Sequence, residues 1–300
     1  MLDLRRLHML RTVAARGSIT AAARSLELSA GAVSQQLSAL RRDVGVELLR
    51  PDGRTVALTE AGRTLLDHTD RILAAVREAE NAVAAVKGTV GATATLAGLP
   101  STASRILAPA LDALRTRHPG LTLTCLITDQ AQLRELTLGT VDVVVGQRYH
   151  HLPDATPQGI EVTSLLDDPL LIVTAADRAD EHPVPLRELA TRDLVLPPPT
   201  TDCGQAVLHA CHQAGFTPTP RYVTADIAAQ LTLARSGLAT ALVPRTAIDP
   251  TASGIRTTPI EDRPITRLLF AATRCTETPN PTTTAVVTAL HTAAHAHHHP

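Results

Sequence analysis

The sequence predicts a three-part fold: a mostly α-helical winged helix-turn-helix at the N-terminus, a long linker helix, and an α/β domain of two Rossmann-like subdomains. Three observations predict it. Short capped helices and a turn-rich hairpin lie in the first 60 residues, an apolar heptad repeat follows, and strand and helix patterns then alternate to the end of the chain. The predicted domains are residues 1–60, 61–88 and 89–300.

Helix start and stop signals define the N-terminal segment. A first helix is predicted over residues 4–15. Ser18 can cap a second helix, which runs to residue 28, because a hydroxyl accepts from amides that lack partners at a helix start. Ser29 can cap a third helix, whose apolar residues recur at spacings of four and three until Gly45 ends it.

A hairpin follows, with predicted strands at residues 46–50 and 55–59 and a Pro-Asp-Gly-Arg turn between them. A tight helix pair followed by such a hairpin is a winged helix-turn-helix, whose second helix fits the major groove of double-stranded DNA. Gln35 is suited to read adenine, and Arg54 on the wing is expected to reach phosphate or the minor groove. The predicted DNA contacts are Ser18, Thr20, Ser29, Ala30, Gly31, Ser34, Gln35, Arg50 and Arg54.

These elements resemble the LysR-type transcriptional regulators, and the resemblance covers essentially the whole chain. The matching segments are A-A-x-x-L at 22–26, L-S-x-x-A-V-S-Q-Q-L at 28–37 and L-T-E-A-G at 58–62. The family usually has Pro in place of Gly31 and often a basic residue in place of Gln35, differences that bear on which bases are read. The resemblance implies a body like a type 2 periplasmic binding protein. Its first subdomain would span 93–162 plus 266–300, and its second 163–265.

The predicted helix that begins after Thr59 and runs to about Lys87 carries apolar residues at alternating intervals of four and three. This 3.5-residue repeat is typical of a coiled coil, although a helix packed on its own domain is the alternative. A homodimer held by this seam would place two heads on the half-sites of an interrupted palindrome, and the resemblance adds a homotetramer. The predicted seam contains Leu65, Ile72, Val76, Ala79 and Val83.

The remaining sequence alternates between strand and helix patterns, as expected of two α/β subdomains. Predicted strands cover 93–99, 121–127, 141–145, 170–174, 193–196, 221–224, 239–243 and 268–272, and predicted helices cover 101–118, 130–138, 185–190, 203–214, 227–236 and a segment from about 281. Ligands of open α/β sheets bind where strands end and helices begin. Several predicted strands here are followed by Ser or Thr residues at the start of a helix. One such hydroxyl by itself is an ordinary helix cap. Together they predict a site for a small polar or carboxylate effector at Ser101, Thr102, Thr128, Thr200, Thr201 and Thr224.

Charge and composition agree with a DNA-binding head on an acidic body. Residues 1–66 hold ten arginines against six acids, whereas residues 88–300 hold 15 basic and 19 acidic residues. The chain has no Trp and four Phe or Tyr residues, which argues against base stacking on single strands. The first predicted helix carries three arginines and no long uncharged apolar run exists, so a cytoplasmic protein with no membrane partner is expected.

Catalytic motifs for hydrolases, P-loop enzymes, zinc proteases and dinucleotide-binding enzymes are missing from the sequence, so an enzyme is not expected. No cofactor is expected, and no metal site is predicted, since the four cysteines form no C-x-x-C pair and the C-terminal histidines suit a frayed end. The alternatives are a thiol redox-sensing regulator that uses Cys203 and Cys211, and a cytoplasmic small-solute-binding protein. RNA polymerase is a further partner if the protein activates transcription.

Overall fold

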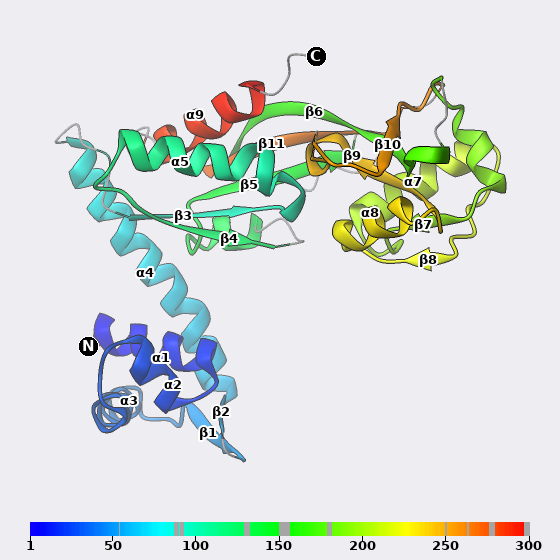
Figure 1. Ribbon diagram of the computed structural model, residues 1–300. Coiled ribbons are helices and arrows are strands. Elements are labelled where there is room, and N and C mark those ends of the chain that lie inside the picture. The colour runs from blue at the N-terminus through cyan, green and yellow to red at the C-terminus, as the bar shows by residue number, and fades with distance from the viewer. Residues whose placement is uncertain are drawn as a thin grey trace. The chain divides into compact units, whose positions relative to one another are not determined.

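The computed structural model describes residues 1–53, 55–86, 90, 93–128, 133–149, 157–178, 182–249, 251–262, 264–275 and 280–296. Its internal contacts divide the chain into two compact units, one made of residues 1–87 and 138–140 and one of residues 88–137 and 141–300. Figure 1 labels the elements of both.

The first unit contains the predicted helix-turn-helix: α1 (Leu4–Arg16), α2 (Ile19–Ser25) and α3 (Ala30–Val44). The caps are those expected from the sequence. The Ser18 hydroxyl accepts from the Ala21 amide and the Ser29 hydroxyl from the Ala32 amide, each at 3.1 Å. The three helices enclose one small core, formed by Leu7, Leu10, Val13, Ala22, Ala23, Val33, Leu37, Leu40 and Leu48.

The helix α2 ends earlier than predicted, at Ser25 rather than near residue 28. Glu27 adopts a left-handed conformation with φ of 55°, and the Leu28 amide donates to the Ala23 carbonyl. This is the hydrogen bond of a Schellman stop, which usually uses glycine. A non-glycine residue at that position gave no stop signal in the sequence.

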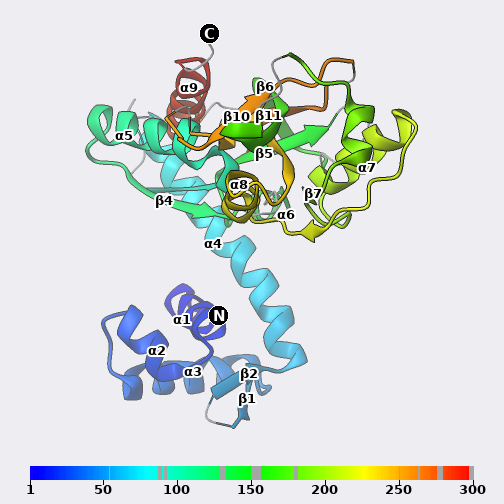
Figure 2. The ribbon, with the colours of Figure 1, turned by 45° about the vertical axis from the view of Figure 1, so that its right-hand side comes forward.

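The wing also differs from the predicted hairpin. Strand β1 (Leu49–Asp52) pairs antiparallel with β2 (Thr55–Leu58), so the strand begins three residues later than predicted and includes Pro51. Proline is tolerated here because β1 has only one neighbouring strand, and its missing N–H can face solvent. Figure 2 shows this hairpin beside α3 and at the start of α4 (Glu60–Val86).

The second unit is built on a mixed sheet with strand order β4-β3-β5-β11-β6-β9-β7-β8, and β10 pairs beside β6. The strand bounds are β3 Thr93–Gly98, β4 Thr122–Ile127, β5 Val143–Tyr149, β6 Ile160–Ala175, β7 Leu194–Leu196, β8 Tyr222–Val223, β9 Thr240–Pro244, β10 Ile255–Thr258 and β11 Thr266–Arg274. The predicted α/β body is confirmed, and the C-terminal strand β11 returns to pair with β5.

Helices cover both faces of each half of this sheet. In the first half, α5 (Ala108–Arg117) and α9 (Pro281–Ala296) pack on one face and the short α6 (Leu133–Thr137) on the other. In the second half, α7 (Asp202–Gln213) and α8 (Ile227–Arg235) take opposite faces. Alternating residues of each central strand enter different cores, which is the two-residue period of a strand buried on both sides.

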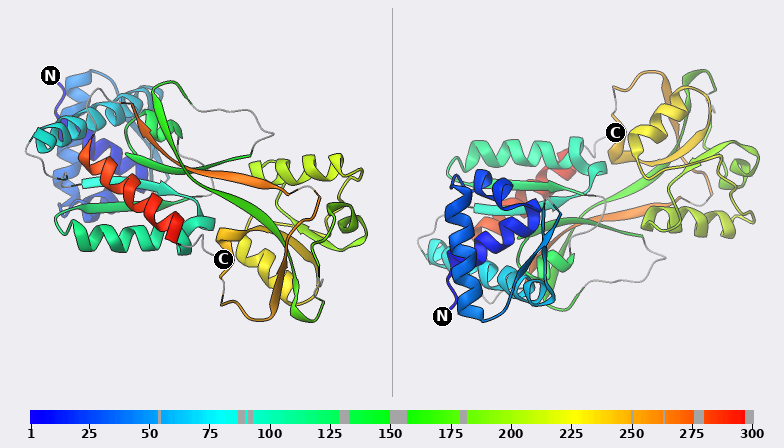
Figure 3. Two further views of the ribbon diagram at one scale, coloured as in Figure 1. Left: turned by 90° about the horizontal axis from the view of Figure 1, so that it is seen from above. Right: turned by 90° about the horizontal axis from the view of Figure 1, so that it is seen from below.

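Two long strands connect the halves, as the view from above in Figure 3 shows. Strand β6 has 16 residues: residues 160–169 pair with β11, whereas Leu170–Val173 pair with β9. The prediction of a strand only at residues 170–174 was wrong, because Asp167-Asp168-Pro169 resembles a turn signal. Strand β11 likewise extends beyond the predicted 268–272.

Several predicted helices are shorter or of another type. The predicted helix at 101–118 is a 3₁₀ turn η1 (Pro100–Thr102) and a π-helical turn η2 (Ala103–Leu107) before α5 begins. The predicted helix at 185–190 is the 3₁₀ segment η4 (Leu186–Thr191), and β10 was not predicted at all. Two further 3₁₀ turns are η3 (Ala176–Arg178) and η5 (Arg245–Ala247). The start of the predicted helix at 130–138 lies outside the described residues. Within the described part of the chain, no helix is both long and apolar enough to cross a membrane.

Candidate functional sites

Helix α3 has one buried face and one exposed face. Val33 and Leu40 are inaccessible to solvent and Leu37 is nearly so, which fixes the helix to the head core. On the opposite face, four neighbouring residues in the first turns are exposed: Ala30, Gly31, Ser34 and Gln35. The helix therefore presents its predicted base-reading residues to solvent from a rigid support, as recognition in a major groove requires.

The other predicted DNA contacts surround this face. Thr20 at the start of α2 and Arg50 on β1 are exposed. The hydroxyls of Ser18 and Ser29 cap their helices, so their role here is to hold the helix ends in place. Arg54 lies outside the described residues.

A contact that the sequence reasoning missed orients α3 against α1. Arg6 on α1 donates its Nε to Gln36 at 3.0 Å and its Nη1 to Asp43 at 2.6 Å. Gln36 and Asp43 are seven residues apart, so they lie on the same face of α3. That spacing on α3, together with a basic residue on α1, is the only sequence signal for this contact.

The residues of the predicted dimer seam differ in their burial, and Val76, in the middle of the seam, is half-buried. Leu65 and Ile72 are half-buried and pack against the core of their own head, and they also line an open groove with Leu2 and Val44. Ala79 and Val83 lie farther along α4 and are exposed, Val83 by 60%. The first turns of α4 thus follow the alternative of a helix packed on its own domain, while the later turns leave apolar side chains uncovered in a single chain.

The six predicted effector contacts also divide in two. The hydroxyl of Thr102 donates to the Leu99 carbonyl, that of Thr201 accepts from the Gly204 amide, and that of Thr224 accepts from the Asp226 amide. All three hydroxyls thus have local partners, and that of Thr201 caps α7. The hydroxyls of Ser101, Thr128 and Thr200 make no hydrogen bond to any other described residue, so they are free to bind a ligand.

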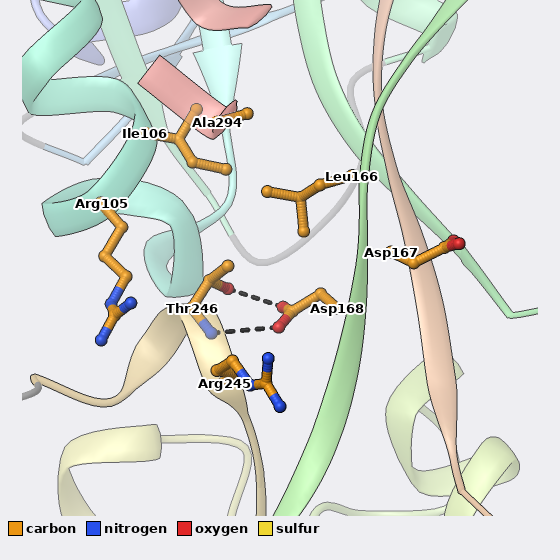
Figure 4. Close-up of a pocket in the computed structure, with 8 residues that line it drawn as sticks. All are labelled: Arg105, Ile106, Leu166, Asp167, Asp168, Arg245, Thr246 and Ala294. Carbon is orange, nitrogen blue, oxygen red and sulfur yellow. Dashed lines mark hydrogen bonds between the residues drawn. The ribbon is translucent and has the colours of Figure 1, made fainter. Parts of the chain in front are cut away.

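A small cavity lies between η2, η5 and β6, close to the point where β6 passes from one half of the sheet to the other (Figure 4). Its volume of about 20 Å³ has room for a single water molecule. It is lined by Arg105, Ile106, Leu166, Asp167, Asp168, Arg245, Thr246 and Ala294. None of these belongs to the predicted effector contacts, so this cavity is separate from the predicted site.

A buried ion pair stands beside that cavity. Asp168 on β6 and Arg267 on β11 approach to 2.8 Å, with side chains 0% and 3% exposed. Asp168 also accepts from the amide and the hydroxyl of Thr246, at 3.1 and 2.6 Å, and Arg267 donates to Gln147 at 2.5 Å. The network joins the two long strands to β5 and η5, and the hydrogen bonds compensate for the desolvation of both charges.

Arg105 makes a second link to the same segment. It is carried by the π-helical turn η2 and donates Nε and Nη2 to the Ile248 carbonyl, at 3.2 and 3.0 Å. Ile248 directly follows η5. The short turn η5 is therefore held from η2 by Arg105 and from β6 by Asp168, so it is a fixed contact point between the two halves of the body.

The four cysteines are free thiols and form no disulfide. Cys203 and Cys211 both lie on α7, eight residues and about 12 Å apart along the helix axis, beyond the reach of a disulfide. Burial raises the pKa of the Cys203 thiol, and burial raises the pKa of the Cys211 thiol to about 11. Thiols with raised pKa values are poorly reactive at neutral pH.

The fold and these surfaces define a class: a winged helix-turn-helix head joined by a long helix to an α/β body with two halves. Two family models match the chain. The bacterial regulatory helix-turn-helix model of the lysR family matches residues 4–63, and the LysR substrate binding domain model matches residues 87–295.

Similar proteins are transcriptional regulators. The chain is 31% identical over 251 residues to the regulator TfdS of Cupriavidus pinatubonensis, covering 81% of this chain and 82% of that protein. It is 32% identical over 200 residues to the RuBisCO operon transcriptional regulator of Allochromatium vinosum, a match that spans only 63% of that relative's length. The crystal structure of full-length CbnR with its target DNA superposes with a TM-score of 0.70, at 26% identity over 97% of this chain and all of that one. The protein belongs to the LysR family of bacterial helix-turn-helix regulators.

Proposed function

We propose that this protein is a sequence-specific, DNA-binding transcriptional regulator of bacterial genes, controlled by a small molecule that binds between the two α/β subdomains. The observation that carries the DNA-binding part is the exposed face of α3. Its four outward residues have no structural duty in the head core, while the opposite face is fully buried. Family membership and the DNA complex of the similar CbnR structure support the same reading.

The target would be double-stranded DNA with two half-sites, read by two heads of a homodimer. The support within the chain is the uncovered apolar end of α4 and the open groove at its beginning, to which a second copy can bind. A tetramer through the bodies, and RNA polymerase as a partner of an activating form, complete the proposed assembly. The division into residues 1–60, 61–88 and 89–300 is part of the same proposal.

The effector is proposed to bind to the free hydroxyls of Ser101, Thr128 and Thr200. The first two follow strands of one half of the sheet and the third precedes α7 of the other half. A ligand bound to both halves would have a different affinity for each hinge state, and only that difference can shift the equilibrium. A coupling of about 1–3 kcal/mol between ligand and DNA would suffice.

DNA binding is tested with Gln35→Ala in the full chain, after an operator has been selected from random DNA. We expect the preference at one base position of each half-site to relax, at a cost of about 1–3 kcal/mol there. Gln36→Ala is the matched control, because the neighbouring Gln36 is bound to Arg6 inside the head. Equal base preference in wild type and Gln35→Ala would contradict the placement of α3 in the groove.

The effector site is tested with a reporter of transcription and the variants Ser101→Ala and Thr128→Val. Each removes one free hydroxyl, and the response to inducer should weaken while operator binding without inducer stays unchanged. Thr201→Val is a different case, since it removes the cap of α7 and should lower stability by about 1 kcal/mol. A normal response in both Ser101→Ala and Thr128→Val would place the sensor elsewhere.

We further propose that the protein acts by binding, without catalysis. It would act in the cytoplasm, where the DNA is. Redox sensing through Cys203 and Cys211 is less well supported, because both pKa values are raised and the two residues are held apart on one helix. A solute-binding protein would make no use of the exposed face of α3. Specific retardation of operator DNA distinguishes the regulator from this last alternative.

A further inference from the structure

The arginines of the head differ in whether an acidic side chain neutralises them. Three of them form ion pairs within the head: Arg6 with Asp43 at 2.6 Å, Arg41 with Glu47 at 2.6 Å, and Arg11 with Asp70 at 3.9 Å. Arg42, in the last turn of α3, is exposed and forms no hydrogen bond or ion pair with another described residue. Its charge is therefore available to a partner outside the chain.

Arg42 lies on the same face of α3 as the proposed base-reading residues. Gln35 follows Gly31 by four residues and Arg42 follows Gln35 by seven, so a helix with 3.6 residues per turn places all three in one stripe. This stripe is opposite the buried face of α3. The neighbouring Arg41 lies off the stripe, because successive residues differ by about 100° around the helix axis, and it is bound to Glu47.

The position of Arg42 along the helix matches the border of a major groove. With a rise of 1.5 Å per residue, Arg42 lies about 10 Å beyond Gln35 toward the C-terminal end of α3. A recognition helix contacts base edges through its N-terminal residues, in a groove about 12 Å wide. A long side chain displaced by that distance on the same face reaches the phosphates that border the groove.

The electrostatics at this end of α3 require a cation for the approach to DNA. The last carbonyls of the helix carry the negative end of its dipole, which repels phosphate. The carboxylates of Asp43 and Glu47 are neutralised by Arg6 and Arg41. Arg42 therefore supplies the uncompensated positive charge of this helix end, in the form of a guanidinium, whose planar donors suit phosphate oxygens.

We propose that Arg42 of each head binds a DNA phosphate at the border of the major groove and so anchors the C-terminal end of α3 to the duplex. The inference rests on the proposed DNA-binding function and adds a contact outside the set predicted from the sequence. Phosphates are the same in every DNA sequence, so Arg42 contributes affinity without base preference, whereas Gln35 contributes the preference.

The proposal is tested by fluorescence anisotropy of the full chain at several KCl concentrations, with the operator selected from random DNA and with a scrambled duplex of the same length. Each phosphate contact contributes about 0.9 to the steepness of log K against log salt concentration, so Arg42→Ala, which removes two contacts per dimer, should reduce the steepness by about 2. The affinity for both duplexes should fall by the same factor. Arg42→Lys should keep the salt dependence, because an ammonium group also neutralises a phosphate.

Arg41→Ala is the matched control, since it removes the same charge from the adjacent position, where Glu47 already neutralises it. Its salt dependence should stay close to that of wild type, and both alanine variants should keep the wild-type unfolding temperature, because both side chains are exposed. Equal salt dependence in wild type and Arg42→Ala would overturn the proposal. An equal loss in Arg41→Ala, or a changed base preference in Arg42→Ala, would also overturn it. A wild-type chain that does not prefer the operator to the scrambled duplex would instead contradict the proposed function.

Discussion

At the scale of single residues, the ion pair of Asp168 and Arg267 shows how the contribution of an ion pair to stability depends on its burial. Both side chains are almost fully excluded from solvent, and each has hydrogen-bond partners besides the other. Arg267→Met would leave the Asp168 carboxylate buried with only Thr246 as a partner. We expect the free energy of unfolding to fall by about 3–5 kcal/mol, measured by urea titration.

The control for that prediction is Arg115→Ala. Arg115 and Asp112 form an equally short ion pair, at 2.7 Å, but both side chains are largely exposed. Water and salt screen such a pair, so its removal should leave the urea concentration at the midpoint of unfolding unchanged. If Arg267→Met lowered the free energy of unfolding as little as Arg115→Ala does, the buried network would not hold the long strands together.

The buried thiol of Cys211 is a second single residue with a predicted effect, because it should make the free energy of unfolding depend on pH. Burial raises its pKa from 9.0 to about 11. Below pH 9 the thiol is neutral in the folded and the unfolded chain, and the full stability is present. Between pH 9 and 11 the unfolded chain ionises first, so the stability falls, by about 1 kcal/mol at pH 10.

Unfolding at pH 8 and pH 10 checks this, with Cys211→Ala as the comparison, because that variant should lose the corresponding part of the pH dependence. After peroxide treatment of the native protein, thiol counting should still find four free thiols. An identical pH dependence in wild type and Cys211→Ala would show that the thiol ionises equally well in both states.

At the scale of elements, the contact between α4 and the wing depends on Gly62. A Cβ atom at this position would lie 2.0 Å from the Leu48 carbonyl oxygen, which also accepts from the Thr59 amide. Gly62→Ala must therefore push the helix start away from the wing. We expect a loss of head stability of about 1–3 kcal/mol or more, and weaker DNA binding, measured by thermal unfolding and by fluorescence anisotropy with operator DNA.

Gly31→Ala is the matched variant for stability. A Cβ atom there meets nothing closer than the Ser29 hydroxyl oxygen at 4.0 Å, and the position is within α3. Alanine should leave the stability of the head unchanged or raise it by about 0.5–1 kcal/mol. Comparable destabilisation in the two variants would mean that the close approach at Leu48 is not the cause.

At the scale of the whole molecule, the proposed dimer can be tested without damage to the head. Ile72 packs on the core of its own head, so an aspartate there would disturb folding as well as assembly. Val83 is 60% exposed in the single chain. Val83→Asp should give monomers by light scattering, because two like charges would face each other in the seam, while the unfolding temperature of the head is retained. If Val83→Asp remained a dimer, the later turns of α4 would not be part of the interface.

Local signals in the sequence determined most of the head. Ser18 and Ser29 cap their helices as expected, because a cap needs only a hydroxyl within three residues of an unpaired amide. The buried face of α3 follows from its apolar spacing, and the order of strands and helices predicted the α/β body. The same order, with the motifs at 22–26, 28–37 and 58–62, was enough to identify the family.

Only the tertiary structure decided features that depend on distant partners. Strand β6 continues through Asp167-Asp168-Pro169 because Arg267 and Thr246, 99 and 78 residues from Asp168 in sequence, neutralise and hydrogen-bond its buried carboxylate. Likewise Thr201 is occupied as a cap and Thr128 is free, although both are hydroxyls between a strand and a helix. A local pattern records which groups a residue offers. Which of them remain available to a ligand depends on the partners that folding brings from elsewhere in the chain.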